Sequence, residues 1–191
     1  NYAVKAFDLS YDYIINSNEK VAEKGHKTEE AINTIDEKLT RYLITLSSEA
    51  LSQKESEVLT NILDSSRDLE RIGDHAEALI NINDYLQRKN VQFSNSALEE
   101  LEDIYRQTSE FVKDALESVE NNDLEMAESL IERHEAINKM ERVLRKTHIK
   151  RLNNGECSTQ AGVNFIDIIS HYTRVSDHAM NLAEKVLAEQ I

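Results

Sequence analysis

The sequence predicts an all-α protein of six helices that form two repeated three-helix bundles. The chain of 191 residues contains no proline and four glycines, so the residues that break helices are scarce. Apolar residues recur at steps of three and four positions along most of the chain, as on one face of a helix. Two segments of the first half also reappear in the second half. Together these observations favour a helical repeat protein.

The first half is expected to hold three helices. We expect the first over residues 1–23, with Gly25 as its C-terminal cap. The second starts near Thr28 and stops at the segment LSSEALS. Ser52 and Glu55 form a Ser-x-x-Glu capping box, which opens a third helix that extends to about Arg88. The apolar positions of the second helix are Ile32, Ile35, Leu39, Tyr42, Leu43 and Leu46.

The second half is expected to repeat this order after the polar segment KNVQFSNS, which divides the chain into residues 1–90 and 91–191. Ser96 and Glu99 form a second capping box, opening a fourth helix that extends to about Glu120. A fifth helix is capped by Asn122 or Asp123 and ends at Gly155. A sixth helix begins after Ser158 and continues to the end of the chain. The two halves together are expected to form one domain.

Two pairs of matching segments support the repeat. ERIGDHAEALI, at 70–80, corresponds to TRVSDHAMNLA at 173–183. EEAINTID, at 29–36, corresponds to HEAINKME at 134–141. Because the matches fall on the second and third helices of each half, they indicate two copies of one structural unit.

Acidic residues occupy an unusual place on the third helix. At about 100° per residue, Glu70 and Asp74 lie one turn apart at the edge of the apolar arc. Carboxylates four residues apart repel each other, and partial burial raises the cost. A basic side chain from a neighbouring helix, a shared proton or a metal ion would offset that cost. Arg71 projects elsewhere on the wheel, which places it with Asp64, Asp68 and His75 on a solvent-facing side.

The same reasoning extends the candidate site to other helices. Carboxylates with an occasional imidazole, projected from facing helices, suit iron, manganese, zinc or magnesium. Thr173 stands where the second repeat would need an acid, so a second site is expected to be weaker, altered or empty. We expect His75 and His178 to be solvated or to act indirectly. The candidate metal ligands are Glu29, Asp36, Glu70, Asp74, His134, Glu141 and Asp177.

Composition excludes several classes of function. The formal net charge of −14 repels nucleic-acid phosphates, so we expect no nucleic-acid partner. No apolar run reaches the roughly 18 residues of a membrane span. Cys157 is the single cysteine and can form no disulfide within the chain. The sequence has no phosphate-binding loop and no order of residues typical of a catalytic triad, which indicates that the protein is not an enzyme.

The segment RDLERIGDHAEAL, with its Glu70-x-x-x-Asp74 spacing, closely resembles the signature of the PhoU family of phosphate-uptake regulators. The resemblance covers nearly the whole chain. It implies two three-helix bundles, similar to spectrin repeats, with iron or zinc clusters bound by the acids at the bundle surface. It also implies a regulatory role in phosphate uptake. We expect the metal-organised acidic surfaces either to sense phosphate, because bound cations reverse the local charge, or to dock on the transporter.

A longer segment, residues 41–77, is similar to the C-terminal domain of bacterial sodium-dependent phosphate cotransporters. This favours the soluble tail of such a transporter, on the cytoplasmic side of the cell membrane. A first residue other than Met agrees with a fragment of a longer chain. The expected partners are the membrane region of the transporter or other phosphate-transport components, and a second copy of the chain in a homodimer. The alternatives are a free-standing PhoU-type regulator and a metal-free helical interaction module.

Overall fold

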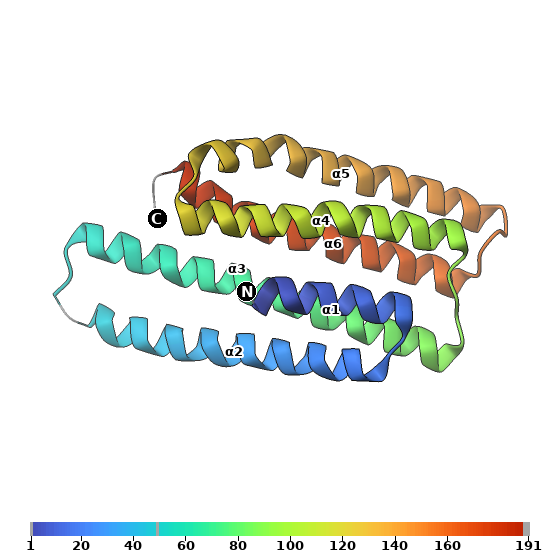
Figure 1. The fold of residues 1–191 in the computed structure, drawn as a ribbon, viewed down its shortest axis with the longest axis horizontal. Coiled ribbons are helices and arrows are strands. Elements are labelled where there is room, and N and C mark those ends of the chain that lie inside the picture. Colours follow the sequence, from blue (N-terminus) through green and yellow to red (C-terminus); the bar gives the residue numbers. More distant parts are fainter. Residues whose placement is uncertain (1, 49, 189–191) are drawn as a thin grey trace.

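The computed structural model describes residues 2–48 and 50–188, and these residues form six α-helices and no strand. The first three helices make one elongated unit, and the last three make a second unit beside it (Figure 1). The predicted all-α fold of six helices is therefore confirmed. The helices are α1 Tyr2–Asn16, α2 Glu19–Ser47, α3 Gln53–Lys89, α4 Asn95–Asn121, α5 Leu124–Asn153 and α6 Thr159–Leu187.

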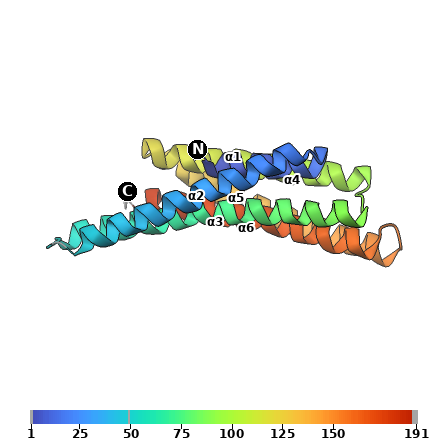
Figure 2. The same ribbon diagram turned by 90° about the horizontal axis from the view of Figure 1, so that it is seen from below.

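The two units are joined mainly through α3 and α6, which run side by side (Figure 2). Helix α1 also contacts α4. One continuous hydrophobic core spans both units and includes Phe7 of α1, Ile72 of α3, Phe111 of α4 and Tyr172 of α6. The third helix of each repeat therefore forms the centre of the molecule. None of the described helices is long and apolar enough to cross a membrane.

The boundary between the first two helices differs from the prediction. The chain turns at Ser17, which has a positive φ of 50°, and the side chain of Asn18 caps α2 by accepting from the backbone N–H of Lys20. Gly25 is not a C-cap, because it lies inside α2. A Cβ at Gly25 would lie 2.3 Å from Cδ1 of Ile80 on α3. Gly25 therefore permits close packing of α2 on α3, and the second helix begins well before Thr28.

The other helix ends agree with the prediction more closely. The capping box at the start of α3 is confirmed, with the Ser52 backbone N–H donating to Glu55 Oε2 at 2.8 Å. Ser158 caps α6, and Asp123 caps α5. The cap of α4 is Ser94 rather than the predicted Ser96. Helix α6 ends at Leu187; the predicted continuation to residues 189–191, like the predicted start at residue 1, lies outside the described residues.

Candidate metal centre

The acids predicted for the first repeat lie together along the seam between α2 and α3. Glu70 and Asp74 project from α3 on one stripe, where Glu77 continues the same face at the next turn. Glu29 and Asp36 project from α2, and Glu29 is buried. The structure therefore brings together all four acids predicted for this repeat, and it adds Glu77.

These carboxylates destabilise one another's charged forms. Burial raises the pKa of Glu29, and the nearby carboxylates of Glu77 and Asp74 raise it further. Burial likewise raises the pKa of Glu70, with Asp74 and then Asp36 adding to the shift and Arg71 opposing it. A cation at this seam would remove the repulsion and favour all the ionised forms.

Basic groups offset part of this repulsion. Arg71 does not project away from the acids, as the wheel predicted, because its Nη1 lies 3.1 Å from Asp74 Oδ2 and its Nε lies 3.7 Å from Glu70 Oε2. The Arg71 side chain is 60% exposed, so solvent screens these contacts. Nδ1 of His26 lies 3.2 Å from Glu77 Oε1. The cluster thus has a partial counter-charge at its rim.

The carboxylate oxygens at this seam are donors of a kind that binds metal ions, but the side chains as they stand are not positioned to hold one. Among the described residues, no three His, Cys, Asp or Glu side chains converge closely enough to hold one ion. Carboxylate oxygens are the donors that manganese and magnesium prefer, and iron and zinc accept them too. Binding would therefore require the half-exposed carboxylates of Glu70 and Asp74 to turn toward those of Glu29 and Asp36.

The second repeat arranges its candidate ligands differently. Nε2 of His134 lies 2.8 Å from Asp177 Oδ1, so these two residues do meet. Glu141 is drawn to Arg145, whose Nε donates to Glu141 Oε1 at 2.7 Å. The hydroxyl of Thr173 donates to its own helix, to the carbonyl oxygen of Ile169 at 3.1 Å. The three predicted ligands of this repeat are therefore split between two separate contacts.

A histidine cluster between α3 and α6 was missed by the sequence reasoning. Nδ1 of His75 lies 3.0 Å from Nδ1 of His171, and Nδ1 of His178 lies 3.0 Å from Asp68 Oδ1. Lys185 also reaches Asp68, at 3.4 Å. Of the α3 residues predicted to meet solvent, Asp68 and His75 therefore pack against α6 instead, whereas Asp64 and Arg71 are exposed. The only signal in the sequence was that the aligned positions of the two repeats both carry an Asp-His pair, which does not show that the two third helices meet.

Comparison with known proteins shows which family the chain belongs to. The chain matches the family described as the PhoU domain over residues 1–82 and 101–186, which cover most of both repeats. The chain belongs to the PhoU domain family. The "Phosphate-specific transport system accessory protein PhoU homolog 1" of Thermotoga maritima is 30% identical over 178 residues, which make up 93% of this chain and 68% of that protein.

Two solved PhoU structures share the fold. PhoU from Pseudomonas aeruginosa superposes with a TM-score of 0.88 and 19% identity, covering 100% of this chain and 91% of that one. The phosphate transport system regulatory protein PhoU from Streptococcus pneumoniae has a TM-score of 0.83 and 20% identity, covering 97% of this chain and 86% of that one. The family model and the Thermotoga maritima relative confirm the predicted PhoU family, and these two structures share its fold.

The two repeats of this PhoU domain have diverged at the candidate site. At the alignment offsets of the matching segments, Glu77 corresponds to Met180 and Thr40 corresponds to Arg145. The second repeat therefore has one acid fewer and one base more at the site, besides its replacement of Glu70 by Thr173. Its donor set fits a metal ion poorly, while that of the first repeat fits one well.

Proposed function

We propose that this PhoU-domain protein regulates phosphate transport through a metal ion bound by the acids of its first repeat. Membership of the PhoU family supports the regulatory role, because the Thermotoga maritima relative is named as an accessory protein of a phosphate-specific transport system. The observation that carries the metal proposal is the cluster of five carboxylates on α2 and α3. Two of them, Glu29 and Glu70, have raised pKa values because of burial and their acidic neighbours.

The residues that would hold the ion are Glu29, Asp36, Glu70 and Asp74, and the suitable ions are iron, zinc and manganese. A bound ion would supply positive charge and open coordination positions at a surface that otherwise repels anions. The carboxylates would fix the ion between two helices, and Arg71, which is paired with Glu70 and Asp74 in the metal-free protein, would be released at the rim to attract an anion. Because the bound ion would make the local charge positive, phosphate would contact the protein through the metal.

The form of regulator that we propose is a PhoU-type accessory protein. The Thermotoga maritima relative is named as an accessory protein, and both solved structures described above are of PhoU proteins. The soluble tail of a sodium-dependent phosphate cotransporter, which the sequence favoured, has support only from the resemblance of residues 41–77. In either form, the expected partner is a phosphate-transport component on the cytoplasmic side of the membrane.

A binding experiment tests the phosphate step. Radiolabelled phosphate is dialysed against metal-free protein and against protein loaded with Mn²⁺ or Zn²⁺, using wild type, Glu70→Ala/Asp74→Ala and the second-repeat control Asp177→Ala. We expect phosphate to bind only to the metal-loaded wild type and control. Equal retention by the metal-free protein, or by the double variant, would contradict metal-mediated phosphate binding.

A cellular experiment tests the regulatory role. Phosphate uptake is measured in cells that lack the protein and in the same cells complemented with the wild type, the double variant or Asp177→Ala. The double variant should leave uptake as in the uncomplemented cells, whereas wild type and Asp177→Ala should both change it. If the double variant changed phosphate uptake as the wild type does, Glu70 and Asp74 would not be required for regulation.

The ion pairs of Arg71 favour a second candidate function, a metal-free helical interaction module. In that case the acids of the first repeat would bind basic groups of a partner protein. This alternative predicts that Arg71→Gln leaves the acids unpaired and strengthens the partner's binding, with no metal bound before or after the change. Metal bound by the wild type would exclude it.

A further inference from the structure

The outer face of α5 carries a stripe of exposed basic side chains in its C-terminal half. Residues 139–151 hold six basic residues and a single acid, although the whole chain has a net charge of −14. Two of the six, Arg145 and Arg151, form ion pairs with Glu141 and Glu100. The other four are exposed, and together with the exposed aliphatic residues between them we call them the basic stripe. The basic stripe consists of Lys139, Arg142, Val143, Lys146, Ile149 and Lys150.

The basic stripe points away from the neighbouring helices. At about 100° per residue, its six positions fall within an arc of about 120°. Other positions of α5 make the contacts with the bundle: Met140 accepts a hydrogen bond from Gln107 of α4, and Arg145 donates one to Ser170 of α6. Helix α5 also lies at the edge of the molecule (Figure 1). The basic stripe is therefore an outer surface of the second repeat.

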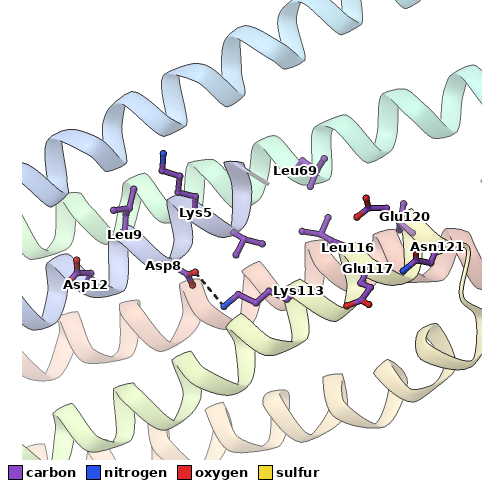
Figure 3. A pocket seen from close by; sticks show the side chains of 12 residues that line it. Lys5, Asp8, Leu9, Asp12, Leu69, Lys113, Leu116, Glu117, Glu120 and Asn121 are labelled. Atoms are coloured by element: carbon purple, nitrogen blue, oxygen red, sulfur yellow. Dashed lines mark ion pairs between the residues drawn. The ribbon is translucent and has the colours of Figure 1, made fainter.

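The four bases of the stripe have no acidic partners among the described residues, where the ion pairs of this part of α5 are those of Arg145 and Arg151. Bases elsewhere in the second repeat are paired. Nζ of Lys113 lies 3.6 Å from Asp8 Oδ2 in the cleft between α1 and α4 (Figure 3). Exposure alone therefore does not explain why the charges of the stripe are unpaired.

Three of the four bases also repel one another. Arg142, Lys146 and Lys150 follow at steps of four residues, and like charges at this spacing destabilise a helix. The helix dipole favours bases only in the last turn, which ends at Asn153, so it accounts for Lys150 but not for Arg142 or Lys146. An arrangement that costs stability in the free protein is typical of a surface that binds something else.

The first repeat shows that the bundle does not need these bases. At the offset of the matching segments on α2 and α5, Arg142 corresponds to Glu37, which forms an ion pair with Arg41 on its own helix. Lys150 corresponds to the uncharged Thr45. The same fold is therefore built in the first repeat with a mixed and partly paired surface, and the run of unpaired bases is a property of the second repeat.

The composition of the stripe suits an anionic phospholipid surface. Clusters of four or more Lys and Arg side chains attract anionic headgroups, and aliphatic side chains among them can enter the boundary between headgroups and acyl chains. Val143 is 56% exposed and Ile149 is 42% exposed, so both are available for this contact. Protein–protein interfaces are depleted in lysine and enriched in aromatic residues, whereas the stripe has three lysines and no aromatic residue. These features favour lipid over an acidic partner protein.

The acids of the chain decide which part of the molecule can approach an anionic surface. The N-terminal half of α5 carries the exposed Glu128, Glu132 and Glu135. Salt screens exposed charges beyond about 8 Å, so these acids repel an anionic surface only where they are close to it. The C-terminal end of α5 and that of α3, whose last turn holds Arg88 and Lys89, lie at one end of the elongated molecule (Figure 1). That end is the one suited to face the membrane.

We propose that the basic stripe of α5 binds the anionic phospholipid headgroups of the membrane beside the transporter. The inference rests on the proposed function only for the presence of the protein near that membrane. The four bases would contact lipid phosphates, while Val143 and Ile149 would lie at the level of the headgroups. The candidate metal ligands of the first repeat are on α2 and α3, so lipid binding and metal binding can be measured separately.

Co-sedimentation with vesicles tests the proposal, in the presence of a chelator and without phosphate. The vesicles contain phosphatidylglycerol and phosphatidylcholine in equal parts, or phosphatidylcholine alone. The stripe variant Lys146→Gln/Lys150→Gln is compared with the wild type and with the control Lys38→Gln/Lys54→Gln, which removes two exposed lysines from the first repeat. Wild type and control should bind the phosphatidylglycerol vesicles, and the stripe variant should bind them about 10-fold more weakly with unchanged helical circular dichroism.

A wild type that does not bind the phosphatidylglycerol vesicles would overturn the proposal and leave the stripe to an acidic partner protein. Equal binding to both kinds of vesicle, or equal binding by the wild type and the stripe variant, would overturn it too, because the charges of the stripe would then not be responsible. The variant Glu70→Ala/Asp74→Ala should bind vesicles as the wild type does. Failure of lipid binding would therefore leave the metal-mediated regulation intact, and failure of metal binding would leave the lipid contact intact.

Discussion

At the scale of single residues, the acids of the first repeat are a cost to the metal-free protein. Glu29 and Glu70 are partly or fully buried beside other carboxylates, and Arg71 compensates them only from an exposed position. In the second repeat Glu141 has a closer partner in Arg145. Residues that destabilise the fold and yet converge on one seam are typical of functional sites.

Removing the repulsion should therefore stabilise the metal-free protein. We expect Glu70→Gln/Asp74→Asn to raise the free energy of unfolding by about 0.5–1 kcal/mol, because two like charges one turn apart are neutralised. Urea unfolding in the presence of a chelator measures this. The matched change Glu141→Gln should lower stability by about 1 kcal/mol, because it weakens the contact with Arg145. If the double variant were less stable than the wild type, the claim that the carboxylates of Glu70 and Asp74 repel each other would be wrong.

Protons should compete with metal at these acids. Burial and the neighbouring carboxylates raise the pKa values of Glu29 and Glu70 above the ordinary glutamate value of 4.5, so their protonated forms persist to higher pH in the folded chain. Their contribution to the stability of the metal-free protein is present below pH 4.5 and is lost as the pH rises through the raised pKa values. Metal binding requires the ionised forms, so isothermal titration should show affinity falling as the pH is lowered toward 4.5. Affinity that does not change with pH would exclude these two ligands.

The types of residue at the site were predictable from the sequence, but the partners of those residues were not. The spacing of Glu70 and Asp74, and the repeat of Asp74 as Asp177, marked the acids. A helical wheel, however, gives the direction of a Cβ and not the reach of a long side chain. It therefore missed that Arg71 folds back onto Asp74. The contact of Arg145 with Glu141 was also missed, although the two residues lie four positions apart on α5, a spacing that brings side chains together.

At the scale of helices, the sequence predicted the elements better than their ends. Ser52 was recognised as a cap because a hydroxyl followed by Glu three residues later satisfies local backbone groups. Gly25 was misread because glycine serves both at helix ends and where helices approach closely. Only the position of Ile80 on α3 decides between these roles, and that contact is a property of the packed structure.

Gly25 provides a test of the α2–α3 packing. We expect Gly25→Val to lower the free energy of unfolding by about 2 kcal/mol, because the added side chain must displace the buried Ile80. Thermal or urea unfolding measures the change. If Gly25 were a cap at the end of a helix, the substitution would leave the α2–α3 contact intact, and the double variant Gly25→Val/Ile80→Ala would recover nothing. Recovery of stability in that double variant is what close packing predicts.

The contact between α3 and α6 should weaken in acid. Burial, together with His171, His178 and Arg174, lowers the pKa of His75 to about 4. Between pH 6.5 and about 4 the unfolded chain therefore binds a proton at this residue that the folded chain does not, and stability falls as the pH falls. We expect the midpoint of thermal unfolding to drop from pH 7 to pH 5, and to drop less in His75→Gln. An identical drop in both proteins would assign the acid sensitivity to other groups.

At the scale of the whole molecule, duplication has left two bundles that differ at the candidate site. The first repeat keeps its acids on α2 and α3, whereas the second pairs Glu141 with Arg145. The sequence predicted the duplication and its divergence at Thr173. It did not show that the two third helices meet through histidines, because a repeat pattern does not reveal how the copies pack together.

Metal content measures the central claim most directly. Wild type, Glu70→Ala/Asp74→Ala and Asp177→Ala are purified without a nickel column or chelator and analysed by mass spectrometry of the elements. We predict iron, zinc or manganese at about one equivalent or more in the wild type and in Asp177→Ala, and a loss of that metal in the double variant. A wild-type protein that stays free of metal even after incubation with all three ions would contradict the claim.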